Sequence, residues 1–211
     1  MHLEFSRRQC IEVFEVRGDV MLFLDGNLQF SSSDERSYHA ALVSPVVAAK
    51  AARVLVVGGG DGLAVRDLLP HASAIVLVEI DIAMTQLFSA EPTLRRLNRG
   101  ALSNPKVRIV NEDIREYLSV DASCFGAIVV DLPDPSSPGM SEVYNTALFR
   151  QLKARLEPGG VMSIQAVTPH SAAHEALRDM VTEAGLRATS FSAPVSSFGD
   201  HAAFLRALSD G

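Results

Sequence analysis

The chain has 211 residues, of which 47% are hydrophobic, and a formal net charge of −6 at pH 7. This length holds one α/β domain with a small additional unit, and the hydrophobic fraction is sufficient for a buried core. The negative charge argues against nucleic acid as a partner, and no apolar run reaches membrane-spanning length, so we expect no membrane association and a cytoplasmic location. Cys10 and Cys124 lie far apart in sequence and near no other metal-ligand residues, which predicts buried or half-buried thiols rather than a metal site or a disulfide framework.

The first part of the chain has the alternation that is typical of β-strands. Residues 11–16 alternate apolar with acidic side chains, a Gly18-Asp19 turn follows, and residues 20–24 form a second apolar run. Another turn at residues 25–27 leads into residues 28–30. A piece of this size is not stable alone, so we expect it to pack against a larger domain.

A helix predicted over residues 37–43 connects this piece to the rest of the chain. We therefore divide the chain into two parts. Residues 1–45 would form a small N-terminal β-hairpin domain with its linker helix, and residues 46–211 a Rossmann-like nucleoside-binding catalytic domain.

The larger part begins with a strand that runs into a glycine-rich turn. Residues 53–57 are apolar and mostly β-branched, residues 58–62 read Gly-Gly-Gly-Asp-Gly, and residues 63–69 have a helical pattern that ends at Pro70. Glycines let the backbone approach a ligand closely, and the free N–H groups of the helix face the carboxyl end of the strand. This pattern favours a bound nucleoside.

Acidic residues follow the next three predicted strands as well. Residues 74–78 are followed by Glu79 and Asp81, residues 107–110 by Asp113, and residues 126–130 by Asp131 and Asp134. In an open α/β sheet, ligands bind at the carboxyl ends of the strands, and an acid about 20 residues after the glycines is suited to a ribose diol. The series of acids predicts one binding site along this edge.

The remaining elements complete the sheet. A helical pattern over residues 141–156 precedes a strand at 161–166, a helix at 170–184 and a final pair of strands at 187–192 and 202–208. The fold class predicted is therefore α/β, a Rossmann-like methyltransferase-type sheet of about seven strands with a small N-terminal β-hairpin domain. Four histidines show no partner pattern and are expected on the surface: His71, His170, His174 and His201.

Over nearly its whole length the chain resembles the spermidine synthase (polyamine aminopropyltransferase) family. The matching stretches are Gln9 to Phe14, Leu24 to Gln29, Asp34 to His39, Gly58 to Gly62, Val78 to Asp81 and Asp131 to Pro135. The resemblance implies transfer of the aminopropyl group of decarboxylated S-adenosylmethionine, as co-substrate, to putrescine or a related amine, with release of 5'-methylthioadenosine. It implies no metal and no other cofactor, and relatives suggest a homo-oligomer, such as a dimer.

The resemblance also implies a role for each matching residue. Asp131 would be the catalytic acid-base residue with Tyr38 beside it, and Tyr38, Asp134 and Gln165 would contact the acceptor amine. Glu79 would hold the ribose hydroxyls and Asp113 the adenine amino group. Further donor-binding residues would be Gln9, His39, Gly58, Gly60 and Asp61.

Two departures from the family pattern concern the acceptor. No acid follows Gln165 closely, and Ser196 or Phe198 stands where a tyrosine is expected. Two alternatives therefore stay open. One is a methyltransferase that uses intact S-adenosylmethionine, which would need a cation for the donor carboxylate, and only Arg66 is close to the glycines in sequence. The other is a non-catalytic nucleoside-binding homologue.

Overall fold

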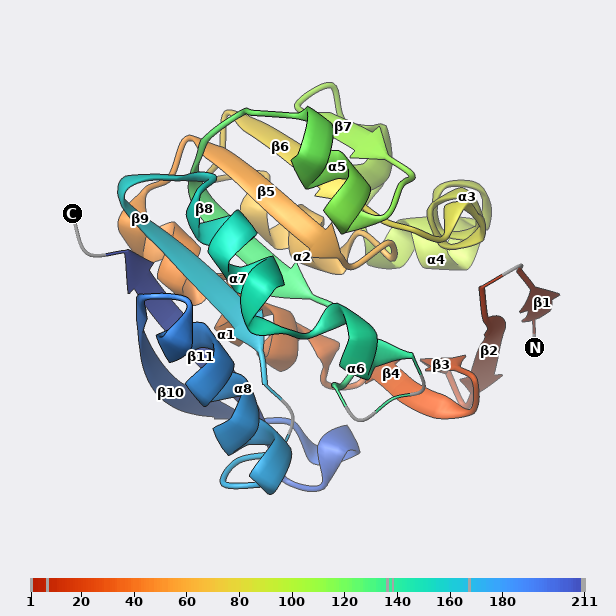
Figure 1. Cartoon of the computed structure of the whole chain (residues 1–211). Helices are drawn as coiled ribbons and strands as arrows, with labels where there is room; N and C mark the ends of the chain where they lie inside the picture. The colour runs from red at the N-terminus through yellow and green to blue at the C-terminus, as the bar shows by residue number, and fades with distance from the viewer. Residues whose placement is uncertain (1, 7, 136, 138, 167, 210–211) are drawn as a thin grey trace.

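The protein is described here by a computed structural model of residues 2–6, 8–135, 137, 139–166 and 168–209 (Figure 1). The N-terminal part is a four-stranded antiparallel sheet in the order β1-β2-β3-β4. Its strands are β1 (His2–Phe5), β2 (Cys10–Val16), β3 (Asp19–Leu24) and β4 (Asn27–Ser31). The strands on either side of the two predicted turns are confirmed, and β1 is an additional strand that the sequence pattern did not reveal.

The larger part contains a seven-stranded sheet in the order β10-β11-β9-β8-β5-β6-β7. Its strands are β5 (Arg53–Gly58), β6 (Ala74–Val78), β7 (Val107–Val110), β8 (Phe125–Asp131), β9 (Leu156–Gln165), β10 (Leu186–Pro194) and β11 (His201–Ser209). The first five are parallel, whereas β11 runs antiparallel to β9 and β10. The predicted α/β fold class is confirmed.

The strand order reverses between β5 and β8, which lie side by side. Gly58 is opposite Asp131 in the register of these two strands. Ligands of open α/β sheets bind at such a switch point, outside the carboxyl ends of the strands. The topology therefore places the glycine loop and Asp131 next to each other, although 73 residues of sequence separate them.

Helices cover both faces of this sheet because successive residues of the buried strands point to opposite sides. Val54 and Val56 belong to one core, and Leu55 and Val57 to the other. The first core is covered by α1 (Glu35–Ala49), α2 (Leu63–Leu68), α3 (Ile82–Ala90), α4 (Pro92–Leu97) and η1 (Ala101–Ser103). The second lies under α5 (Ile114–Val120), α7 (Thr146–Lys153) and α8 (Ala172–Glu183), which share the near face in Figure 1.

The N-terminal sheet shares the first core. Phe30 of β4 is 1% exposed and meets the ring of Phe88 of α3 edge-on, with 6.2 Å between centroids. The linker helix is longer than predicted, since α1 extends to Ala49, and Ser163 of β9 donates a hydrogen bond to the Leu42 carbonyl of this helix. The division into residues 1–45 and 46–211 stays a prediction.

The helix predicted over residues 141–156 is wrong, because two shorter helices occupy this stretch. α6 (Met140–Val143) ends before Tyr144, and α7 begins after Asn145. Asn145 has extended backbone and its side chain accepts a hydrogen bond from the Leu148 amide, so it caps a new helix instead of continuing the first.

Several other features depart from the sequence pattern. His174 is buried and is held at both ring nitrogens, by the Ala166 carbonyl and by the Ser190 hydroxyl, so the surface position predicted for it is wrong. His71, His170 and His201 are exposed, as predicted, and Cys124 is exposed rather than half-buried. Within the described ranges, no helix is long and apolar enough to cross a membrane.

Candidate active site

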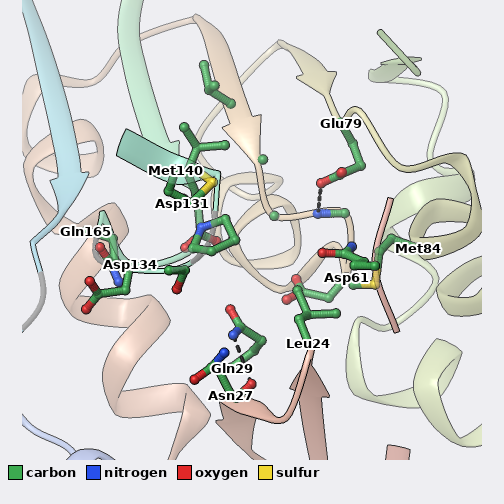
Figure 2. Close-up of a pocket in the computed structure, with 18 of the residues that line it drawn as sticks. Leu24, Asn27, Gln29, Asp61, Glu79, Met84, Asp131, Asp134, Met140 and Gln165 are labelled. Carbon is green, nitrogen blue, oxygen red and sulfur yellow. Dashed lines mark hydrogen bonds between the residues drawn. The ribbon is translucent and has the colours of Figure 1, made fainter. Parts of the chain in front are cut away.

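A cavity of about 580 Å³ opens at the carboxyl ends of β5, β6 and β8 and extends to the turn between β3 and β4 (Figure 2). It is lined by every residue that the sequence predicts for the site: Gln9, Tyr38, His39, Gly58, Gly60, Asp61, Glu79, Asp113, Asp131, Asp134 and Gln165. In Figure 2, Asp131, Asp134 and Gln165 lie toward one side of the cavity, and Asp61 and Glu79 toward the other.

The glycine loop leaves no room for side chains at Gly58 and Gly60, among others. Gly58 has a φ of +76°, and a Cβ there would lie 2.4 Å from the Asp131 carbonyl oxygen. A Cβ on Gly60 would lie 2.6 Å from Cγ of Glu79. The loop is therefore packed directly against the two acids that follow β8 and β6, and only glycine permits this approach.

Glu79, at the end of β6, is almost fully buried and is fixed by two backbone amides. Its Oε2 accepts from the Gly60 amide at 3.1 Å (Figure 2), and its Oε1 accepts from the Asp81 amide at 2.8 Å. Desolvation raises the pKa of Glu79 to about 7, with the charges of Asp81 and Asp61 acting in the same direction and the two amides opposing them. Each carboxylate oxygen keeps acceptor capacity, as binding of a ribose diol requires.

Two more acids, Asp131 and Asp61, lie beside the glycine loop. The Tyr38 hydroxyl donates to Oδ1 of Asp131 at 3.3 Å, and Oδ1 of Asp61 accepts from the Leu63 amide at 2.8 Å. Burial raises the pKa of Asp131 to about 6; His39 and the Tyr38 hydroxyl lower it and Asp61 raises it further. Burial is also the main cause of the raised pKa of Asp61. The charge of Asp61 therefore makes ionisation of the Asp131 carboxyl less favourable.

Arg66, the cation closest to the glycines in sequence, is buried and fully engaged elsewhere. Its Nη1 and Nη2 donate to the two carboxylate oxygens of Glu35 at 2.8 and 2.9 Å, and its Nε donates to Asp67 at 2.7 Å. Among the described residues that line the cavity, the basic side chains are Arg8, His39 and His201. Arg66 is absent from that lining, so its guanidinium is not presented to a ligand.

Gln9 and Asp113 line the cavity but also bind other protein groups. The Gln9 amide donates to Oδ2 of Asp81 at 3.0 Å. Asp113 is paired with the Arg115 guanidinium at 2.6 Å, and hydrogen bonding from Arg115 is the main cause of its lowered pKa. A contact between adenine and Asp113 would have to share the carboxylate with Arg115.

On the acceptor side, two buried polar atoms have no hydrogen-bond partner within the described part of the chain. These atoms are Oε1 of Gln165 and the hydroxyl of Tyr144. Gln165 lines the cavity, and Phe198 rather than Ser196 lines it where a tyrosine is expected. Burial is the main cause of the raised pKa of Tyr144, and the charges of Asp131 and Asp134 add to it.

Other residues of the lining were not assigned a role from the sequence. The β3–β4 hairpin contributes Leu24 of β3 and Asn27 and Gln29 of β4, which lie beneath the acids in Figure 2. Apolar side chains include Met84 of α3 and Met140 of α6. The stretch from Leu24 to Gln29 carries part of the family resemblance, and this resemblance was the sequence signal that could have identified Leu24, Asn27 and Gln29 as lining residues. No group of three or more His, Cys, Asp or Glu side chains in the described ranges could hold a metal ion.

Known proteins resemble this chain in sequence and in fold. It is 39% identical over 206 residues to polyamine aminopropyltransferase 2 of Ralstonia nicotianae and 41% identical over 212 residues to the polyamine aminopropyltransferase of Mycobacterium tuberculosis. These matches cover 95% and 97% of this chain but only 40% of each relative, so the chain spans about two fifths of their length.

Solved structures share the fold at lower identity. A spermidine synthase in complex with the transition state analogue AdoDATO superposes with a TM-score of 0.90 at 21% identity, covering 99% of this chain and 73% of that one. The spermidine synthase of Thermotoga maritima gives a TM-score of 0.86 at 20% identity, covering 99% of this chain and 71% of that one. The model of the spermine/spermidine synthase domain matches residues 35–196, which include the glycine loop and the acids that surround it, and the chain belongs to this family.

Proposed function

We propose that this chain transfers the aminopropyl group of decarboxylated S-adenosylmethionine to putrescine or a related amine, releasing 5'-methylthioadenosine. The observation that carries the proposal is the charge arrangement beside the glycine loop. Asp61 and Asp131 face the cavity there and outnumber the one basic side chain beside them, His39, while the nearby Arg66 guanidinium is paired with Glu35 and Asp67. A donor with an ammonium group and no carboxylate suits this arrangement.

The charges of Asp61 and Asp131 favour binding of the decarboxylated donor over binding of intact S-adenosylmethionine. A donor carboxylate within about 4 Å of one of them would experience a repulsion of roughly 4 kcal/mol at an effective dielectric constant near 20. The donor ammonium would be attracted instead. Even about 1.4 kcal/mol of net preference gives tenfold discrimination.

Asp131 is suited to the acceptor amine. The attacking nitrogen must lose its proton, and deprotonating an alkylamine of pKa about 10.4 at pH 7 costs about 4.6 kcal/mol. With a pKa of about 6, the Asp131 carboxyl is ionised at neutral pH and can accept that proton or orient the nitrogen lone pair toward the carbon beside the sulfonium. Tyr38 fixes the carboxylate through Oδ1. The sulfonium sulfur leaves as a neutral thioether.

The other residues take roles that match their positions. Glu79, held by the Gly60 and Asp81 amides, would accept the ribose hydroxyls, and Asp113 would reach the adenine amino group. Gln9 and His39 would contact the donor. Asp134 and Gln165 would bind the acceptor, the latter through the buried Oε1 that has no other partner in the described chain.

Product analysis tests this proposal. The chain is incubated with decarboxylated S-adenosylmethionine and putrescine, and 5'-methylthioadenosine and spermidine are measured by mass spectrometry. Equal amounts of both products support the proposal. Methylated amine formed from intact S-adenosylmethionine would support the methyltransferase instead, and donor binding without product from any of several di- and monoamines would support a nucleoside-binding role.

No acid follows Gln165 closely in sequence, and this is the observation that keeps the acceptor open. Comparing putrescine with longer diamines and with monoamines in the same assay identifies the preferred amine. A cytoplasmic location and assembly into a homo-oligomer, expected from the sequence, stay predictions. Size-exclusion chromatography with light scattering tests the second, and a monomeric mass would contradict it.

A further inference from the structure

Glu35 is a buried carboxylate that lies behind the cavity and has no role in the proposed reaction. It is 2% exposed, and the Arg66 guanidinium donates to both of its oxygens. Desolvation alone would raise its pKa, but hydrogen bonds from His39 and Arg66 and their charges lower that pKa to about 2. Glu35 is therefore ionised at every pH at which an enzyme of this kind is assayed.

The contacts of Glu35 determine which nitrogen of His39 carries a proton. Nδ1 of His39 lies 2.9 Å from the Glu35 carbonyl oxygen and 3.0 Å from Oε2 of its carboxylate. A carbonyl and an ionised carboxylate only accept hydrogen bonds, so Nδ1 must be the donor. The Nδ1 edge of the ring is turned to Glu35, which leaves the Nε2 edge for the cavity that His39 lines.

The charged groups around His39 come from four elements. Glu35 belongs to α1, Arg66, which is paired with Glu35, to α2, Asp61 to the glycine loop, and Asp131 to the end of β8. The uncharged ring of Tyr38 lies 4.9 Å from the His39 ring between centroids. Burial lowers the pKa of His39, but the hydrogen bond from Nδ1 to Glu35 and the charges of Asp61, Asp131 and Glu35 raise it to about 9. The free chain thus holds an imidazolium beside the carboxyl groups of Asp61 and Asp131.

A donor with a sulfonium and an ammonium group brings two positive charges to this place. With the imidazolium retained, His39, Asp61, Asp131 and the donor would sum to one positive charge in a partly desolvated cavity. With the Nε2 proton lost, they sum to zero. Loss of that proton therefore favours binding, and Nδ1–H, held by Glu35, stays in place.

We propose that Glu35 is a positioning residue that fixes His39 as the Nδ1–H form, and that His39 releases its Nε2 proton to solvent when the doubly cationic donor binds between Asp61 and Asp131. The Nε2–H bond breaks, its electron pair stays on nitrogen, and the proton passes to buffer. The part that concerns the donor rests on the proposed function, whereas the part that concerns the tautomer does not.

NMR of the ligand-free chain with ¹⁵N-labelled histidine tests the tautomer of His39. In the unsubstituted protein we expect both His39 nitrogens to be protonated at pH 8 and Nδ1 alone to be protonated once the ring is neutral. In Glu35→Gln the side-chain amide oxygen can still accept from Nδ1, but the negative charge is lost. We therefore expect the titration midpoint of His39 to fall by more than about one pH unit. The matched control is Asp67→Asn, which removes the other carboxylate bound to Arg66 and contacts no histidine, and should leave the midpoint unchanged.

His174 is an internal reference, because it is equally buried and is held by a carbonyl and a hydroxyl without a carboxylate. Its signals should not respond to Glu35→Gln. A neutral His39 protonated at Nε2, or equal midpoints in the Glu35 and Asp67 variants, would overturn the positioning role. If Glu35→Gln does not fold, a neutral His39 ring protonated at Nε2 in the unsubstituted protein still overturns the proposal.

Calorimetry at pH 8 in buffers of different ionisation enthalpy counts the protons released on binding. This pH lies above the pKa of Asp131, about 6, and below that of His39, about 9. We expect about one proton released with decarboxylated S-adenosylmethionine, about none with neutral 5'-methylthioadenosine, and about none with the donor in His39→Asn. Equal release in His39→Asn, or none in the unsubstituted protein, overturns the coupling. A donor that does not bind at all refutes the proposed function and the coupling together, while the NMR result on Glu35 stands.

Discussion

Replacing Asp131 by Asn should slow turnover and at the same time stabilise the folded chain. Asn keeps an acceptor for the Tyr38 hydroxyl but removes the charge and the proton-accepting ability. General-base and orienting groups contribute about 10²- to 10⁴-fold to rates, so we expect kcat to fall by that factor. Binding of neutral 5'-methylthioadenosine should change less than about threefold, because the adenine and ribose contacts are untouched.

The stability change follows from the pKa of Asp131, which is raised from 3.8 to about 6. A raised pKa means that the folded chain binds this proton more tightly than the unfolded chain. The stabilisation from the protonated form is therefore present below pH 3.8 and is lost as the pH rises through about 6. At pH 8 the ionised carboxyl costs about 1–3 kcal/mol, which for a chain of this size corresponds to a Tm higher by roughly 2–12 °C in Asp131→Asn.

Thermal unfolding at pH 8 and at pH 4 measures this difference. The Tm advantage of Asp131→Asn should be clear at pH 8 and nearly absent at pH 4. Asp179→Asn, an exposed substitution on α8 outside the cavity lining, is the matched control and should show neither effect. If Asp131→Asn keeps most of its rate, the catalytic role of Asp131 is refuted. If it is no more stable than the control at pH 8, the destabilisation by the ionised carboxyl is refuted.

Three further results are expected. Gly60→Ala should weaken binding of 5'-methylthioadenosine at least about tenfold in a calorimetric titration, because its Cβ would meet Glu79 at 2.6 Å, and unchanged affinity would contradict the packing of this loop. The pKa of Glu35 is lowered to about 2, so the stabilisation from its ionised form is present above pH 4.5 and is lost as the pH falls toward 2. Glu35→Gln should therefore flatten the acid limb of a curve of Tm against pH. An unaltered acid limb would contradict this. Phe30→Ala should cost about 3–5 kcal/mol in urea unfolding, because it removes the buried ring that packs on Phe88, and a loss below about 1 kcal/mol would contradict the shared core.

The sequence predicted the parts of the site that local patterns determine. The strand at residues 53–57, the glycines after it and the acids after the next strands follow from periodicity and turn chemistry, and parallel strands necessarily bring such ends to one edge. The structure gives the reason for two of the glycines, because Gly58 and Gly60 leave no space for a Cβ. The pairing of Gly58 with Asp131 depends on the strand order, which no local pattern determines.

Features that depend on contacts between distant side chains were not predictable. Arg66 looks like a cation beside the glycine loop, but Glu35, 31 positions earlier, neutralises it, and nothing in the local sequence indicates this pair. His174 has no nearby partner in sequence, yet its ring is held by Ser190 across the gap between α8 and β10. The break before α7 depended on the backbone of Asn145, whose capping role overrides an otherwise continuous helical periodicity.

The central claim is that the acids beside the glycine loop select a donor without a carboxylate. Calorimetric titration of the chain with decarboxylated and with intact S-adenosylmethionine, at pH 8 and low salt, tests this most directly because the two ligands differ only in that carboxylate. We expect the decarboxylated donor to bind at least about tenfold more tightly, which corresponds to about 1.4 kcal/mol, with the ratio reduced in Asp61→Asn. Equal or tighter binding of intact S-adenosylmethionine would contradict the account.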